Sequence, residues 1–448
     1  MLKGIGLGLA LSPTLLLAGS QAVPPPAPTM VPTATDVSAW QSTQAAPSTP
    51  LTTILRANMP AWDHHTGVIT PEDVNAQLTN PANTGDKAAA VAFMADFENA
   101  NHFQIDLTPQ MITHYEQANA AGTYTGWDDA YSADQSHLAT EMADGVYQSG
   151  HPALSQLSQD FGDCYFVSGV GWMTANNEPA AANLIHVEPN GTYDVHFPGY
   201  HQQKVTLTQA EVAYAANDTP GGTSQIILEK AAGMVRNNTD ALHYLQGGAA
   251  NPFAGIDNGG YPAMTITLLT GHQANTVQIH QDGYNLNQMR QDLSANLPHN
   301  MVLASTTKSI DGVPGDHALA VLGYDKATDT VKVWDPWGSE PPDSHVTQDG
   351  NGVFTMKAAD FYQTFHQLDF EMPGTHGDVN QLLNANVALN ASDAHLGPEV
   401  IGGTALLVAT AAVTAAVLIH RRHEAAERRL LSGSGKGGQS VSNGLGQV

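Results

Sequence analysis

The residue best suited to chemistry in this 448-residue chain is its single cysteine, Cys164. It stands in a Gly-Asp-Cys-Tyr-Phe segment at 162–166, and the apolar run after it predicts a helix that begins at the thiol. The positive end of a helix dipole favours the thiolate, which is the nucleophilic form. A lone cysteine also occurs as a small buried apolar residue. Because the chain has only one cysteine, an internal disulfide framework and a zinc site built on several thiolates are excluded.

A thiolate nucleophile needs an imidazole to take and return protons and a third group to orient that imidazole. Among the 20 histidines, His317 stands out because it opens a predicted strand and has small neighbours. The next predicted strand, 331–334, ends at Asp335. Adjacent antiparallel strands would hold imidazole and carboxylate side by side, and the indole of Trp337 would shield them from water. Spacing alone makes Cys164, His317 and Asp335 a candidate triad.

The elements that must position these residues come in the order helix first, strands later. Apolar spacing predicts a helix after the cysteine and another over 226–235, whereas 192–197 alternates like a strand and further alternating strands follow. From residue 154 to about residue 368 this order predicts an α+β domain, with a helical lobe packed on an antiparallel sheet.

The segment around Cys164 resembles the calpain-type branch of the papain-like cysteine proteases, whose nucleophile lies in a Gly-Asp-Cys-aromatic motif at a helix start. Further segments of this chain are similar to landmarks of that family, in the same order. They are Asn-Gly-Thr-Tyr-Asp-Val-His-Phe at 190–197, Leu-Glu-Lys-Ala at 228–231, Leu-Gln-Gly-Gly at 245–248, Leu-Leu-Thr-Gly at 268–271, His-Ala at 317–318, Asp-Pro-Trp-Gly at 335–338, and Gly-Val-Phe-Thr-Met at 352–356 with Asp360, Phe361 and Phe365. The resemblance covers residues 154–371.

The resemblance implies a two-lobed papain-like fold and a role for each residue of the triad. Cys164 would be the nucleophile, His317 the general base and then acid, and Asp335 the residue that orients the imidazole. The family normally has Asn where this chain has Asp335. Because an Asp can still accept from the imidazole and stabilises imidazolium more strongly, we expect activity with a shifted pH profile.

A second departure concerns the oxyanion hole. The family has a Gln six residues before the cysteine, and here that position is Ser158, with Gln159 one place later. Either the loop is one residue shorter and Gln159 supplies the donor, or the oxyanion hole is weaker. Losing such a donor costs about 3 kcal/mol in the transition state.

The resemblance implies no cofactor for the chemistry itself, with calcium as a structural activator whose ligands the sequence does not identify. Upstream, the segments 67–74 and 103–109 resemble an EF-hand loop running into its exiting helix. The first three ligand positions of the first loop would be Trp62, His64 and Thr66, however, and calcium needs carboxylates or amides there. We therefore expect an ordinary helical region.

Three segments precede the protease-like part. Residues 1–22 have the layout of a secretory signal peptide, and 23–53 form a Pro/Ala/Ser/Thr-rich leader that predicts disorder. Residues 54–150 are predicted to be mainly helical. This region is equally consistent with a propeptide, a docking domain or part of the protease fold.

Three further segments follow it. Residues 372–399 contain few large apolar groups and are predicted to be a stalk. Residues 400–419 are uncharged, and a helix of that length spans about 30 Å, which predicts a transmembrane helix. The tail, 420–448, begins with basic residues, which predicts a cytoplasmic tail and an ectodomain outside the cell membrane.

The charge of the chain restricts its partners. It has 42 acidic and 16 basic residues, for a formal net charge of −26. A polyanion would approach against repulsion, so we expect no nucleic-acid partner, and membrane attachment through the transmembrane helix rather than through anionic lipid. The expected partners are protein or peptide substrates.

Two alternatives to an endopeptidase remain open. One is a catalytically inactive calpain-like module that binds partners at the surface, which the displaced Gln159 favours. The other is an acyl transferase of transglutaminase type, because Asp335 replaces the usual Asn. The aromatic residues after Cys164 and the Pro-Trp-Gly after Asp335 favour the protease.

Overall fold

The computed structural model describes residues 49–380, with gaps at 65, 102–105, 148–149, 160, 201–203, 218–220, 238–254, 257–258, 308–314 and 339–345. The predicted signal peptide, transmembrane helix and cytoplasmic tail, and the landmark at 245–248, lie outside the described residues. Within the described part, no helix is long and apolar enough to cross a membrane.

The first part of the described chain is a helical module. Its helices are α2 (Leu51–Trp62), α3 (Pro71–Leu78), α4 (Asp86–Ala100), α5 (Pro109–Ala120) and α6 (Gly126–Asp144). The loop after α2 and the loop after α4 meet at an antiparallel bridge, in which Ile69 and Leu107 each donate to the other's carbonyl at 2.9 Å. The two EF-hand-like segments are therefore a paired unit, joined through their backbones.

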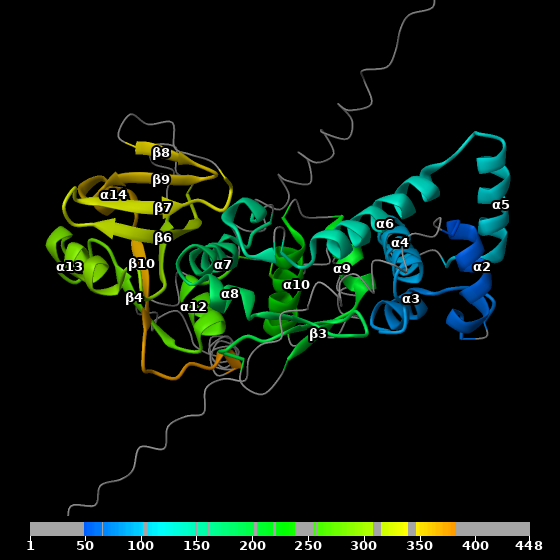
Figure 1. Cartoon of the computed structure of the whole chain (residues 1–448), viewed down its shortest axis with the longest axis horizontal. Helices are drawn as coiled ribbons and strands as arrows, with labels where there is room; N and C mark the ends of the chain where they lie inside the picture. The colour runs from blue at the N-terminus through cyan, green and yellow to red at the C-terminus, as the bar shows by residue number, and fades with distance from the viewer. Residues whose placement is uncertain are drawn as a thin grey trace, which may run out of the picture.

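The helical module shares its core with the next part of the chain. Trp127 of α6 stacks on Tyr115 with ring centroids 4.6 Å apart. Tyr214, from α9 (Gln209–Ala216), is buried in the same cluster. The hydroxyl of Thr208, which caps α9, donates to the carbonyl of Leu78. The module is thus packed against α9 and lies at the opposite end of the molecule from the large sheet (Figure 1).

The remainder of the described chain divides into a helical lobe and a sheet lobe. The helical lobe contains η2 (Leu154–Gln156), α7 (Cys164–Asn176), α8 (Glu178–Ala182), α9, α10 (Thr223–Asn237) and α12 (Pro262–Thr270), with a small antiparallel sheet of β1 (Ile185–Val187), β2 (Tyr193–Val195) and β3 (Val205–Leu207).

The sheet lobe is a seven-stranded antiparallel sheet in the order β4-β10-β5-β6-β7-β9-β8. Its strands and helices are β4 (Gln273–Gln278), α13 (Leu286–Asn296), β5 (Val302–Thr306), β6 (His317–Asp325), β7 (Thr330–Trp334), β8 (Val346–Gly350), β9 (Val353–Lys357), α14 (Ala358–Thr364) and β10 (Gln367–Met372). The expected α+β class, with helices and antiparallel sheets, is confirmed.

Close packing fixes α7 against this sheet. A Cβ at Gly171 would lie 2.1 Å from the Trp334 ring of β7, so only glycine allows this approach. At the next residue of α7, the indole of Trp172 donates to the carbonyl of Val321 at 2.9 Å. That carbonyl lies at an irregularity in the β6–β7 pairing, between Val321 and Gly323. The helix that begins at Cys164 is therefore held directly on the strand that begins at His317.

Two predicted boundaries differ from the structure. The leader was expected to reach residue 53, but α2 begins at Leu51, whose side chain is fully buried. The stalk was expected to begin at residue 372, but the amides of Gly377 and Val379 donate to the carbonyls of Gly271 and Gly199. Short segments poor in large apolar residues still fold when their backbone groups find partners on a formed domain.

Candidate active site

Cys164 is the first residue of α7 and is partly exposed. The amides of Phe166 and Val167 both donate to the carbonyl of Asp163, at 2.7 and 3.1 Å, so the helical bonding starts immediately before the cysteine. The predicted nucleophile therefore combines a position at a helix N-terminus with access from solvent.

His317 is the first residue of β6, as expected, and lies opposite Thr306 of β5. Its Nε2 is 2.8 Å from Oδ1 of Asp335. The Cys164 side chain lies close enough to that of His317 to raise the pKa of the imidazole. The structure thus brings the three candidate residues together, although they are far apart along the chain.

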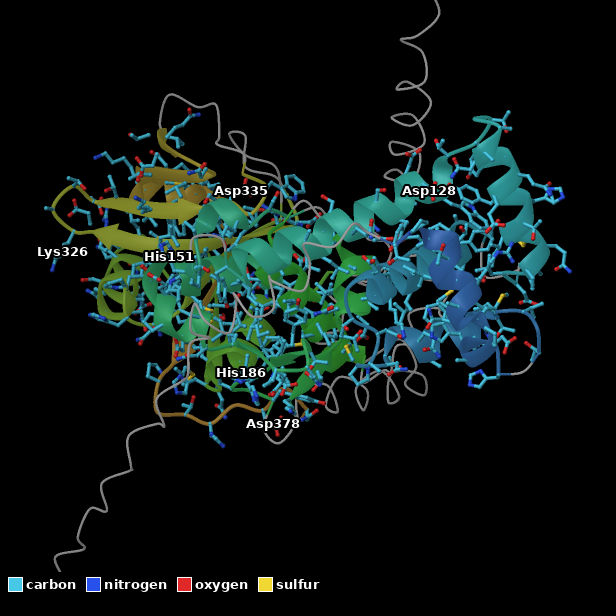
Figure 2. All side chains as sticks on the ribbon, turned by 45° about the vertical axis from the view of Figure 1, so that its right-hand side comes forward. Asp128, His151, His186, Lys326, Asp335 and Asp378 are labelled. Carbon is cyan, nitrogen blue, oxygen red and sulfur yellow. The ribbon has the colours of Figure 1, made fainter. Side chains whose placement is uncertain are left out.

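Asp335 follows β7 directly, in a loop that accounts for its orientation. Its Oδ1 also accepts from the amide of Trp337 at 2.9 Å, and its own amide donates to Gly352 at 2.9 Å. Gly352 has φ +75°, and a Cβ there would lie 2.6 Å from the Asp335 carbonyl oxygen. Figure 2 shows Asp335 where the large sheet meets the helices, far from Asp128 of the helical module.

An indole covers the buried pair. His317 is 3 % exposed and Asp335 is 2 % exposed, whereas Trp337 is 41 % exposed. The Trp337 ring centroid lies 4.7 Å from that of His317, with the planes tilted by 35°. Trp337 therefore separates the imidazole from bulk water, as the sequence predicted.

The charges around His317 favour its protonated form. Burial lowers the pKa of His317, but the hydrogen bonds and charges of Asp335 and Cys164 outweigh that effect and raise it to about 9. At neutral pH the imidazole of His317 is therefore protonated.

In the loop before Cys164, the backbone of Gln159, not that of Ser158, is bonded to the loop that carries Asp335. Gln159 is buried, and its amide donates to the carbonyl of Pro336 at 2.8 Å, next to Asp335. Its side-chain Nε2 donates to Phe161, and its Oε1 has no hydrogen-bond partner among the described residues. The amide and carbonyl of Ser158 are instead both held by the Gln225 side chain of α10, at 2.7 and 2.6 Å.

The structure adds a glycine pair that sequence reasoning missed. The amide of Gly259 donates to the carbonyl of Gly162 at 2.9 Å, so this segment runs beside the cysteine loop. A Cβ at Gly260 would lie 2.5 Å from the Tyr165 ring. Two consecutive glycines just before an apolar helix were the available signal, because they leave backbone uncovered by side chains.

The described residues contain no group of three or more His, Cys, Asp and Glu side chains able to hold a metal ion. In the first EF-hand-like loop, Trp62 occupies the first ligand position and is buried. Asp73, at the last position, pairs with the His64 imidazole and bonds the amide of Thr70. This carboxylate thus belongs to the capping box of α3 and accepts hydrogen bonds there.

No protein-family model matches the chain, and no match was found among curated proteins.

Proposed function

We propose that this chain is a calpain-like cysteine endopeptidase that cleaves peptide bonds through a thioacyl intermediate on Cys164. One observation carries the proposal. A partly exposed cysteine at a helix start lies close enough to His317 to raise its pKa, and His317 is in turn oriented by Asp335 and covered by Trp337. This is the nucleophile, base and orienting group that thiol proteolysis needs.

The residues would act in two half-reactions. The Cys164 thiolate attacks the scissile carbonyl, and the His317 imidazolium gives its proton to the leaving amine as the C–N bond breaks. Neutral His317 then takes a proton from water, which attacks the thioester and releases the carboxylate product and the thiol. Asp335 accepts from Nε2 throughout, which leaves Nδ1 for the sulfur and the proton transfers.

The negative oxygen of each tetrahedral intermediate needs donors. We assign the Cys164 backbone N–H, at the helix start, and the side-chain amide of Gln159. Gln159 suits this role because its backbone is tied to Pro336 of the Asp335 loop. A side-chain amide nitrogen has two hydrogens, so the bond to Phe161 leaves one available.

The proposed substrates are unstructured segments of proteins or peptides. The predicted signal peptide and the apolar segment 400–419 would place the catalytic domain outside the cell, anchored by one helix, with the basic tail inside. Calcium belongs to the proposal only as a structural activator and is tested as such.

The test is cleavage of an unstructured protein by the full chain in mild detergent, across pH and with and without calcium. Wild type should cleave, a thiol alkylator should block cleavage, and Cys164→Ala and His317→Ala should abolish it. His186→Ala is the matched control, because His186 is an exposed histidine on β1 and should be dispensable.

The alternatives give different outcomes in the same assay. If no cleavage occurs in any condition, and Cys164 is alkylated no faster than a free-cysteine peptide, the chain is an inactive binding module. Incorporation of an amine into a glutamine-containing substrate would instead support a transglutaminase-type transferase, which Asp335 in place of the usual Asn favours.

A further inference from the structure

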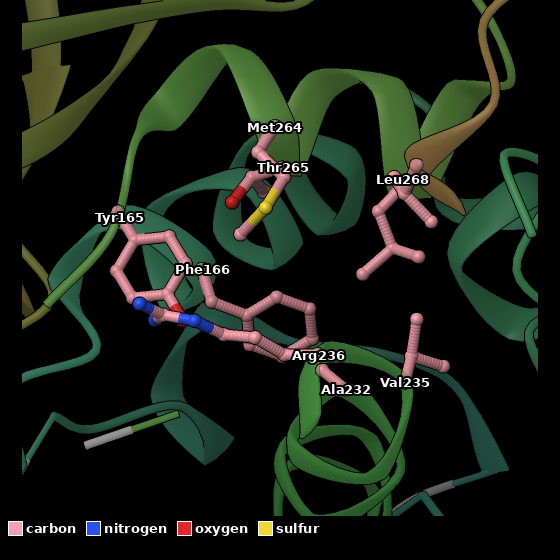
Figure 3. A pocket seen from close by; sticks show the side chains of 9 residues that line it. Tyr165, Phe166, Ala232, Val235, Arg236, Met264, Thr265 and Leu268 are labelled. Carbon is pink, nitrogen blue, oxygen red and sulfur yellow. The ribbon is translucent and has the colours of Figure 1, made fainter. Parts of the chain in front are cut away.

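Arg236, in the last turn of α10, connects the segments on either side of the nucleophile. Its Nη1 donates to the Tyr165 hydroxyl at 2.8 Å and also to the carbonyl of Gly259. The guanidinium carbon lies 5.5 Å from the centre of the Tyr165 ring. Figure 3 shows the Arg236 side chain extending from α10 to Tyr165, beside Phe166.

Both partners of Arg236 are next to Cys164. Tyr165 follows the cysteine directly, and its hydroxyl donates to the carbonyl of Ile256 at 3.3 Å. Gly259 is bonded through its amide to Gly162, two residues before the cysteine. Arg236 therefore ties Gly259 to Tyr165 of α7, while the amide of Gly259 ties the same residue to Gly162.

Arg236 thus holds the Gly259–Gly260 backbone against the loop that carries Cys164. Because glycines have no side chain, this backbone would be open to an extended peptide whose carbonyl carbon reaches Cys164. The position of the glycine pair relative to the sulfur would then determine how well the peptide is aligned.

We propose that Arg236 is a positioning residue that fixes the Gly259–Gly260 backbone relative to Cys164 and so strengthens the binding of peptide on the acyl side of the scissile bond. This inference rests on the proposed protease function. It predicts an effect on the binding of extended peptides, not on the intrinsic reactivity of the thiol.

The test compares Arg236→Met with Arg236→Lys in the full chain. For a substrate with several residues on the acyl side, Arg236→Met should raise KM about tenfold, the effect of one lost charge-assisted hydrogen bond. We expect kcat to change less than about threefold and the Tm to stay close to that of wild type. Arg236→Lys keeps a charged donor and should recover part of the loss.

Arg290→Met is the matched control, because Arg290 forms an ion pair with Asp329 that is remote from the site. It should leave KM unchanged. The proposal is overturned if both Met variants behave alike, or if the loss falls on kcat for long and short substrates equally.

Labelling of Cys164 separates this inference from the proposed function. A dipeptidyl vinyl sulfone should label Arg236→Met about tenfold more slowly than wild type, whereas iodoacetamide should label both equally. This comparison needs a reactive thiol but no turnover. A chain that labels in this pattern without hydrolysing peptides would refute the protease and retain the role of Arg236. Equal labelling of both variants by the vinyl sulfone would refute the role of Arg236 alone.

Discussion

Replacing Asp335 by Asn tests the electrostatics of the site most directly. Asp335 Oδ1 accepts from His317 Nε2 at 2.8 Å and from the Trp337 amide at 2.9 Å. An Asn Oδ1 can accept both bonds, so the orientation of the imidazole should survive. What changes is the charge of the acceptor, in a pair that is almost completely buried.

The size of the effect follows from that loss of charge. A charge-assisted hydrogen bond is stronger than a neutral one by about 1 to 2 kcal/mol. One pKa unit corresponds to about 1.4 kcal/mol, so the pKa of His317 should fall by about one unit from its value of about 9. A raised histidine pKa stabilises the protonated form at low pH, and this stabilisation is lost as pH rises through the pKa. The activity of Asp335→Asn should therefore begin to decline, on the alkaline side, at a lower pH than the activity of wild type.

The assay is kcat/KM of both proteins from pH 5 to 10. The alkaline limb should shift down by about one unit, with activity at pH 7 within about fivefold of wild type. Asp335→Ala is the contrasting variant, because it leaves two N–H donors unpaired and should cost about 100-fold. Complete inactivity of Asp335→Asn, or equal losses in the two variants, would refute the reasoning.

Three further variants test packing, shielding and a buried charge. Gly171→Ala places a Cβ 2.1 Å from Trp334. It should lower the free energy of unfolding of the catalytic domain by about 1 to 3 kcal/mol, measured in urea. An unchanged urea midpoint would contradict the close packing of α7 on the sheet. Trp337→Ala exposes His317 to water and should lower kcat about tenfold with little change in Tm, so full activity would rule out shielding. Glu98 is fully buried, and burial raises its pKa to about 8. In the unfolded chain Glu98 loses its proton at a lower pH than in the folded chain, so wild-type stability should fall as the pH rises from about 4.5 to 8. Glu98→Gln should remove that decline, and parallel stability–pH curves for the two proteins would refute it.

Much of the site could be predicted because its signals are local. An apolar run after Cys164 marks a helix start, and α7 begins at that residue. Small residues after His317 and the alternation before Asp335 mark strands, which are β6 and β7. Adjacent antiparallel strands then bring histidine and aspartate together through simple sheet geometry.

Other features depend on contacts between distant segments. Nothing local distinguishes Gln159 from Ser158, and it is the bond from the Gln159 amide to Pro336 that joins Gln159 to the loop that carries Asp335. The bonds that join Arg236 to Gly259 and Gly259 to Gly162 link three segments that are far apart in the chain.

By itself, the sequence determined which reactive groups this protein has: one thiol, and a histidine and a carboxylate that are candidates to act with it. It also determined the helix that begins at the thiol, the strand that begins at the histidine and the strand that ends before the carboxylate. Those properties follow from residue type and short-range periodicity. Tertiary structure decided that Gln159 is bonded to the Asp335 loop, that Trp337 covers His317, and that the helical module packs on α9. These depend on side-chain packing and hydrogen bonds between segments far apart in the chain, whose relative positions no local pattern encodes.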